Sequence, residues 1–127
     1  MKVEQFFKSI IDEDRSPVVI CDLTHTIIYM NPTACERYSK RGGAALVGCS
    51  LMNCHNSESN EKILKVLEWF EYSKLHNRIL IDYNEKENKD VYMVALRNEE
   101  GELIGYYEKH EYRNRETEPL YNMDLRS

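Results

Sequence analysis

Residues 18–32 have the sequence VVICDLTHTIIYMNP, and this stretch decides the fold of the chain. Two apolar runs rich in β-branched residues flank a polar turn at residues 22–25, and this pattern predicts a β-hairpin. Asn31-Pro32 follows directly. Proline ends the second strand because it has no N–H to donate to a sheet. The hairpin is therefore expected to span residues 17–30, with helical structure after it.

An amphipathic helix is predicted before the hairpin, at residues 2–12. Its apolar residues recur at helical spacing and fall on one face. Ser16-Pro17 ends the segment, because proline disfavours helix in the residue before it. The apolar face consists of Val3, Phe6, Phe7, Ile10 and Ile11.

Several helices are predicted after the hairpin, the first two at residues 33–40 and 44–47. Asn31 or Thr33 is the candidate N-cap of the first, because both side chains accept hydrogen bonds from free backbone N–H groups. The longest helix is expected at about residues 58–75. Its candidate caps are Ser57 and Ser59, and its apolar face consists of Ile63, Val66, Leu67 and Phe70.

Three strands are predicted at the C-terminal end, at residues 78–83, 90–97 and 102–112. Two groups of strands on either side of the helices indicate an α+β domain. In such a domain one antiparallel sheet of five strands carries the helices on one face. The last three strands have apolar residues on both sides, so both faces of the sheet are expected to be covered. The N-terminal helix is the expected cover of the second face.

Length and charge limit the class of protein. The chain has 127 residues, which is enough for one domain of ordinary size. Its formal net charge is −5 and its only short basic run is Lys40-Arg41, so neither nucleic acid nor an anionic membrane is expected as a partner. No apolar stretch approaches the ~20 residues that span a bilayer, and no secretory signal pattern is present. A cytoplasmic location is therefore expected.

The sequence shows no catalytic or metal-binding motif. No Cys-x-x-Cys pair occurs, so no structural zinc site is predicted. In a reducing compartment the cysteines are expected to be free thiols. The chain has no Gly-rich phosphate loop and no Gly-x-Ser-x-Gly motif, and its carboxylates are scattered through polar runs. A binding protein is therefore expected in place of an enzyme. The four cysteines are Cys21, Cys35, Cys49 and Cys54.

The ordered set of motifs resembles the PAS family. The hairpin at residues 18–32 is similar to the family's opening strand pair, in which an aspartate precedes the turn and Asn-Pro ends the second strand. Leu46-Val47-Gly48 resembles the family's short helix that ends in glycine, and residues 98–105 resemble its last hairpin. The resemblance covers about residues 4–112 and implies a PAS fold with strand order 2-1-5-4-3. The expected parts are an N-terminal cap helix at residues 1–15, a PAS core at residues 16–112 and a polar tail at residues 113–127.

The resemblance implies a sensory module in signal transduction. PAS domains bind a small molecule between the sheet and the long helix, or bind none and mediate dimerisation. They usually pass a signal to an output domain, and this chain has no kinase, cyclase or DNA-binding segment. Either the domain acts on a separate output protein, or the chain is one piece of a longer sensor. The leading hypothesis is a ligand-binding sensor, and the alternatives are a protein–protein adaptor with a filled pocket and a haem-binding sensor.

The loop before the long helix is the expected mouth of the pocket. His55 lies in this loop, where it either contacts a ligand or hydrogen-bonds the loop backbone. The long helix is expected to supply an apolar wall, and tyrosines on the opposing strands are expected to supply hydroxyl groups. The predicted ligand-binding residues are Cys54, His55, Val66, Phe70, Tyr92 and Tyr106.

Only a few residues in the sequence indicate a possible cofactor. Haem ligation through His55 is a minority hypothesis, with His76 at the helix end as the other candidate. Asn53-Cys54 matches part of the motif of the flavin-binding light sensors. The four residues that follow do not continue the motif, so flavin is not expected. Of the other histidines, His25 is expected to be exposed in a turn, and His110 is expected on a solvated or dimer-facing edge.

A homodimer is predicted through the N-terminal helix. Phe6, Phe7 and Ile10 lie on one face of a short helix and must be buried on the sheet of the same chain, on a partner, or on both.

Overall fold

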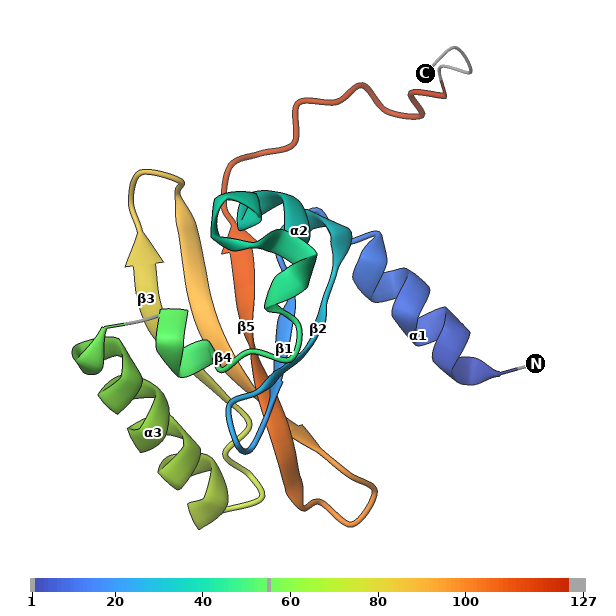
Figure 1. The fold of residues 1–127 in the computed structure, drawn as a ribbon. Helices are drawn as coiled ribbons and strands as arrows, with labels where there is room; N and C mark the ends of the chain where they lie inside the picture. Colours follow the sequence, from blue (N-terminus) through green and yellow to red (C-terminus); the bar gives the residue numbers. More distant parts are fainter. Residues whose placement is uncertain (1, 55, 124–127) are drawn as a thin grey trace.

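The computed structural model, which describes residues 2–54 and 56–123, contains a single five-stranded antiparallel sheet (Figure 1). The strand order is β2-β1-β5-β4-β3, which confirms the order predicted from the sequence. The first strand pairs with the last, and Ile20 lies between Tyr29 and Tyr107. The strands are β1 (Val19–Asp22), β2 (Ile27–Met30), β3 (Arg78–Asn84), β4 (Lys89–Arg97) and β5 (Leu103–Tyr112).

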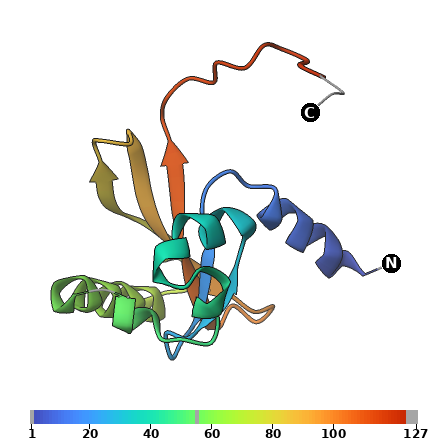
Figure 2. The same ribbon diagram turned by 45° about the horizontal axis from the view of Figure 1, so that its top comes forward.

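The helices that follow the hairpin lie over one face of the sheet. The short helices cover the β1–β2 half, whereas α3 lies towards the β3–β4 half (Figure 2). Asn56 caps α3, because its side-chain oxygen accepts a hydrogen bond from Ser59 N at 2.8 Å, so the prediction of a serine cap was wrong. Among the residues that the structure describes, no helix is both long and apolar enough to cross a bilayer. The helices are α2 (Pro32–Arg37), η1 (Ser39–Arg41), η2 (Gly43–Leu46), η3 (Leu51–Cys54) and α3 (Ser57–Tyr72).

The hydrophobic core lies between these helices and the inner face of the sheet. Alternate residues of each strand point inward, so that Met93 on β4 and Tyr106 on β5 are both buried. The buried face of α3 packs against them, and Phe70 is fully buried there. The cluster of buried residues consists of Cys21, Ile27, Met30, Ala34, Ile63, Val66, Phe70, Met93, Leu103 and Tyr106.

Asn31 joins three segments at the end of the hairpin. It is fully buried and also caps α2. Its side-chain oxygen accepts from Val18 N and Ala34 N, each at 2.9 Å. Its amide nitrogen donates to Ile11 O at 2.9 Å and to Ser16 O at 3.0 Å. One side chain therefore holds the chain before the hairpin, the first strand and the first helix after it.

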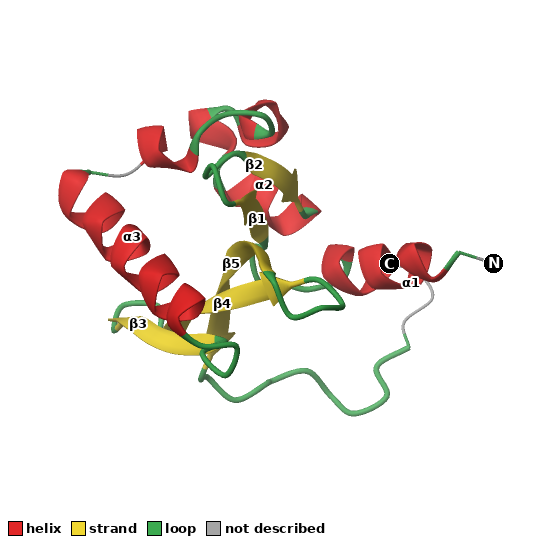
Figure 3. Cartoon of the chain, turned by 90° about the horizontal axis from the view of Figure 1, so that it is seen from below, coloured by secondary structure: helices red, strands yellow, loops and turns green. Residues whose placement is uncertain are grey.

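The N-terminal helix α1 (Val3–Asp12) does not cover the sheet, so that part of the fold prediction was wrong. Asn31 and the hydrogen bond from Tyr29 to Asp12 fix its C-terminal end beside β2. The rest of the helix projects beyond the edge of the sheet (Figures 1 and 3). None of its described residues is buried. The outer face of the sheet, with half-buried Ile20 and exposed Leu80, is left without this cover.

Candidate functional site

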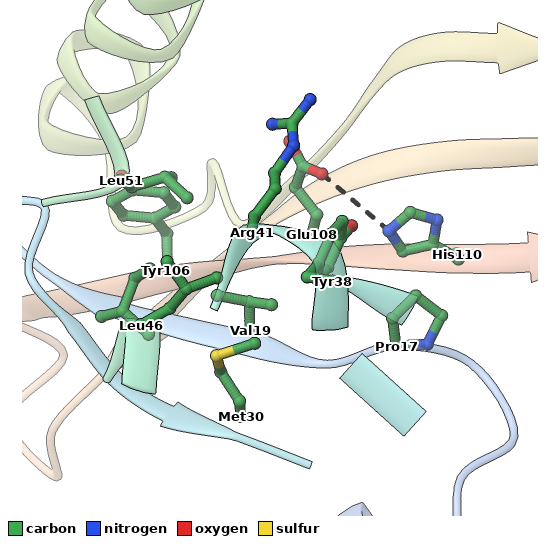
Figure 4. A pocket seen from close by; sticks show the side chains of 11 residues that line it. Pro17, Val19, Met30, Tyr38, Arg41, Leu46, Leu51, Tyr106, Glu108 and His110 are labelled. Atoms are coloured by element: carbon green, nitrogen blue, oxygen red, sulfur yellow. Dashed lines mark ion pairs between the residues drawn. The ribbon is translucent and has the colours of Figure 1, made fainter. Parts of the chain in front are cut away.

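A partly enclosed cavity of about 110 Å³ lies between the short helices and the inner face of β1, β2 and β5 (Figure 4). We refer to it as the apolar cavity, because most of its wall is hydrocarbon. No side chain of α3 lines it, whereas the sequence predicted a pocket against the long helix. Its apolar lining residues are Pro17, Val19, Ile27, Met30, Leu46 and Leu51, and its polar ones are Tyr38, Arg41, Tyr106, Glu108 and His110.

Tyr106 stands at one end of the apolar cavity, and its side chain is only 1% exposed (Figure 4). Its hydroxyl group is 2.8 Å from Nδ1 of His25 in the turn between β1 and β2. Burial raises the pKa of the Tyr106 phenol, so the ring stays neutral and polar at physiological pH. His25 is half-buried, which corrects the expectation that it is an exposed turn residue.

Glu108 and His110 form the other end of the apolar cavity (Figure 4). His110 is 8% exposed, and its Nε2 lies 3.9 Å from the Glu108 carboxylate. Burial, followed by the positive charges of Lys89 and Arg37, lowers the pKa of His110 to about 4, so the imidazole is neutral at pH 7. The expectation of a solvated edge was wrong because residues 106, 108 and 110 share the inner face of β5.

A second hollow, of about 270 Å³, lies on the other side of Glu108 and His110. We refer to it as the polar hollow. It is bounded by the first turns of α3, the end of α2 and the inner face of β3, β4 and β5. It is therefore the space that matches the pocket predicted between the long helix and the sheet, although its lining differs. The lining residues are Arg37, Ser59, Lys62, Ile63, Ile81, Asp82, Asn84, Lys89, Val91, Glu108 and His110.

A partly exposed ion-pair cluster borders the polar hollow. Arg37 donates to both carboxylate oxygens of Glu87, each at 3.0 Å. Lys89 is only 2% exposed, and its Nζ lies 3.3 Å from the same carboxylate. The hydrogen bonds from Arg37, with the charge of Lys89, lower the pKa of Glu87 to about 2. The carboxylate is therefore ionised at neutral pH.

The predicted site residues are distributed over three environments. Tyr106 lines the apolar cavity, as described above. Val66 and Phe70 lie in the hydrophobic core and line neither hollow, so the space where they were expected to face a ligand is filled by their own side chains. Tyr92 lies on the outer face of the sheet, where Arg78 stacks over its ring at 4.0 Å and Arg113 donates to its hydroxyl group. Tyr92 does not line either hollow, because successive residues of β4 point to opposite faces and the residues on both sides of Tyr92 point inward.

The predicted contact at Cys54-His55 lies outside the part of the chain that the structure describes. His55 lies outside the described residues, and Cys54 is the last residue of η3, with its side chain likewise outside them. The other haem candidate, His76, is already engaged, because its ring stacks on Trp69 and its Nδ1 lies 2.6 Å from Trp69 O. A haem or a flavin is far larger than the apolar cavity. In the described part of the chain no three His, Cys, Asp or Glu side chains gather as a metal site.

Four polar residues of the apolar cavity were not among the predicted ligand-binding residues. They are Tyr38, Arg41, Glu108 and His110. For two of them a signal was present. Tyr106 is a predicted ligand-binding residue. Because a strand repeats its direction every second residue, a Tyr106 that contacts the ligand places Glu108 and His110 on the same face. Arg41 and Tyr38 lie on the short helices, where no periodic pattern is long enough to assign a face.

Stability should depend on pH through His110. Its pKa is lowered from 6.5 to about 4 in the folded state, so between these pH values the unfolded chain binds a proton that the folded domain does not. The contribution of neutral His110 to stability is therefore fully present above pH 6.5 and is lost as the pH falls towards 4. The free energy of unfolding should decrease by roughly 3 kcal/mol over that range from this residue. Denaturant unfolding at several pH values should show a shallower decrease for H110Q than for the wild type. Identical profiles for H110Q and the wild type would contradict the assignment.

No family model matches the sequence, and no curated protein matches it. Solved structures match over most of the chain. The C-terminal domain of a Streptococcus mutans protein has a TM-score of 0.66 at 19% identity, covering 88% of this chain and 85% of that one. A PAS domain from Colwellia psychrerythraea has a TM-score of 0.63 at 13% identity, covering 88% and 98%. A sensory box sensor histidine kinase from Vibrio cholerae has a TM-score of 0.56 at 11% identity, covering 86% and 90%.

At these identities the likeness concerns the fold. The sheet order, the short helices followed by one long helix, and the return of the last strand to the first agree with the architecture implied by the sequence motifs. This chain has the fold of a PAS domain.

Proposed function

We propose that this chain is a sensory module that binds a small molecule in the apolar cavity and passes the signal to an output domain or an output protein. The fold supports a sensory or signalling role, because PAS domains generally serve as sensors and a structural neighbour is a sensor histidine kinase. The single observation that carries the ligand is the apolar cavity itself. Mostly hydrocarbon walls with a few polar groups are typical of small-molecule sites.

The volume of the apolar cavity limits the ligand. An engineered protein cavity of about 150 Å³ admits benzene, so a space of about 110 Å³ suits a ligand of about six non-hydrogen atoms. The polar groups are arranged along the cavity, with Tyr106 at one end and Tyr38, Arg41, Glu108 and His110 towards the other (Figure 4). A ligand with a compact hydrocarbon body and one polar group matches this lining.

Native mass spectrometry tests this proposal. Protein purified from the organism that makes it should carry a small non-covalent ligand. Leu46→Trp should abolish the bound mass, because the indole fills the apolar cavity. The matched control is Val47→Trp, because Val47 is 45% exposed and does not line the cavity. A ligand-free wild type, or equal occupancy in both variants, would contradict the proposal and favour the adaptor function.

A homodimer is the second part of the proposed function. Phe6, Phe7 and Ile10 on α1 are 54%, 56% and 70% exposed, and an isolated helix of this length is marginal in water. The helix projects away from its own sheet, whose outer face carries exposed Leu80 and half-buried Ile20 without this cover (Figure 3). A second copy of the chain offers the missing partner for both surfaces, with α1 of each protomer on the outer face of the other.

Light scattering after size-exclusion chromatography tests the dimer. The wild type should have twice the 15.1 kDa mass of the chain. The double variant Phe6→Ser with Phe7→Ser should have the monomer mass, because it removes the largest apolar side chains of α1. Tyr72→Ser is the control, since Tyr72 is 86% exposed on α3 and should leave the dimer intact. A wild-type monomer at micromolar concentration would exclude this interface.

A further inference from the structure

The tail that follows β5 contains a short apolar segment. Its side chains are almost entirely exposed, with Leu120 at 91%, Tyr121 at 89% and Met123 at 76%. Within the described part of the chain, the hydrogen bonds of residues 117–123 stay inside the tail. Neighbouring apolar side chains that all face solvent mark a segment that packs on another surface.

An ion pair ties the tail to the end of α1. Arg15, which follows α1 closely in the chain, pairs with Glu116. The Glu116 carboxylate also accepts hydrogen bonds from the backbone N–H groups of Thr117 and Glu118, at 2.9 and 3.1 Å. The apolar segment of the tail therefore starts from a point that is held at the C-terminal end of α1.

The tail is long enough to lie along α1. It extends towards the same side of the sheet as α1 in both views of the ribbon (Figures 1 and 2). From Glu116, an extended chain reaches at most ~14 Å at Leu120 and ~25 Å at Met123. The axis of α1, with 10 residues, is about 15 Å long. The apolar segment can therefore reach the whole of α1 while the ion pair stays in place.

The apolar face of α1 offers a matching surface. Phe6, Phe7 and Ile10 are 54%, 56% and 70% exposed, and no described residue of α1 is buried. Burial of leucine, tyrosine and methionine side chains against this face would remove apolar surface of both segments from water. Methionine is well suited to such a contact, because its flexible thioether packs favourably against aromatic rings.

We propose that residues 117–123 are a strap that closes on the apolar face of α1 in the same chain, with Leu120 and Met123 against the rings of Phe6 and Phe7. The structure has the strap open, with its tether already formed. The closed strap excludes a second copy of the chain from the same face. This effect on assembly rests on the proposed homodimer, whereas the contact between tail and helix does not.

Nuclear Overhauser effects between tail methyl groups and α1 rings test the contact. The full chain carries Leu80→Glu, which adds a charge to the exposed outer face of the sheet and so keeps a partner away without altering α1. With labelled leucine and methionine methyl groups, Leu120 and Met123 should show effects to ring protons of Phe6 or Phe7. Absence of these effects would overturn the proposal.

A mixed sample distinguishes the same chain from another copy. Chains with labelled methyl groups and deuterated rings are mixed with chains whose rings are protonated, so that only contacts between chains are detected. The mixture should show no effect between tail and helix. Effects that persist in it would assign the tail to α1 of a second copy and overturn closure within one chain.

Charge reversal tests the tether. Arg15→Glu should reduce the effects between tail and rings by about twofold or more, because an attractive exposed pair becomes a repulsive one. Combining it with Glu116→Arg should restore them, since the pair is then rebuilt with its charges exchanged. Unchanged effects in Arg15→Glu would show that this ion pair does not hold the strap.

The dimer in the otherwise wild-type chain tests the competition. Leu120→Ser with Met123→Ser should lower the dissociation constant of the dimer about fourfold for a strap that is closed half of the time, because both protomers must open. Leu75→Ser is the matched control, since Leu75 is 89% exposed beyond the end of α3. An unchanged dissociation constant would refute the competition. A wild-type monomer would contradict the proposed homodimer alone, and the Overhauser effects would still decide whether the strap closes.

Discussion

Replacing Asn31 with alanine is expected to lower the free energy of unfolding by about 3–5 kcal/mol. The side chain is fully buried and makes four hydrogen bonds of 2.9 to 3.0 Å to backbone groups. Alanine would leave those N–H and C=O groups in a buried site without partners. Domains of this size are stable by only about 5–15 kcal/mol, so the variant should be marginally folded.

Urea unfolding followed by circular dichroism measures the loss. The matched control is Asn56→Ala, which removes the cap of α3 at an exposed position and should cost about 1 kcal/mol. If Asn31→Ala loses no more than this control, Asn31 does not hold the three segments together as described.

Replacing Gly105 with alanine is expected to lower the free energy of unfolding by at least about 3 kcal/mol, or to prevent folding. A Cβ atom at this position would lie 2.3 Å from Cys21 O on β1. Asp22 pairs with Gly105, so the neighbouring backbone cannot withdraw without breaking the contact between the first and last strands. The expected result is loss of the pairing that defines the strand order.

Hydrogen exchange at the β1 and β5 amides, together with thermal unfolding, detects this loss. Gly48→Ala is the control, because a Cβ there meets nothing within 4 Å. Its φ of +95° alone should cost about 1–2 kcal/mol. Equal destabilisation by the two substitutions would show that close packing of β1 on β5 is not the cause.

The sequence was sufficient to predict the sheet because its signals are local. Residues 18–32 combine β-branched runs with a turn and an Asn-Pro stop, and each feature acts through its own backbone. The order of the strands then followed from the resemblance of the whole set of motifs. The predicted boundaries of α3 were less accurate. The helix begins after Asn56 and ends at Tyr72, whereas the prediction extended it to residue 75.

The packing of α1 was not predictable from its apolar face. The face itself, with Phe6, Phe7 and Ile10, is visible in the sequence, but its direction depends on contacts made by Asn31 and Tyr29 with the end of the helix. Such contacts join residues far apart in the chain and leave no periodic signal. The pattern therefore predicts that the face needs a partner without identifying the partner.

The position of the candidate site depended on side-chain volume, which a sequence pattern does not contain. Phe70 and Val66 fill the space beneath α3, so the remaining room lies under the short helices and beside the first turns of α3. Tyr92 and Tyr106 were equally plausible on residue type alone. The strand register decides between them, because Tyr106 pairs with Ala95 on the inner face and Tyr92 pairs with Lys109 on the outer one.

A high-resolution crystal structure of the wild type, purified from the organism that makes it, tests the central claim most directly. The apolar cavity between Tyr106, Leu46 and His110 should contain continuous electron density for a molecule that is not part of the chain. That density should touch both the hydrocarbon wall and at least one polar group of the lining. A structure in which these side chains close over the cavity and leave no space for a ligand would contradict the account.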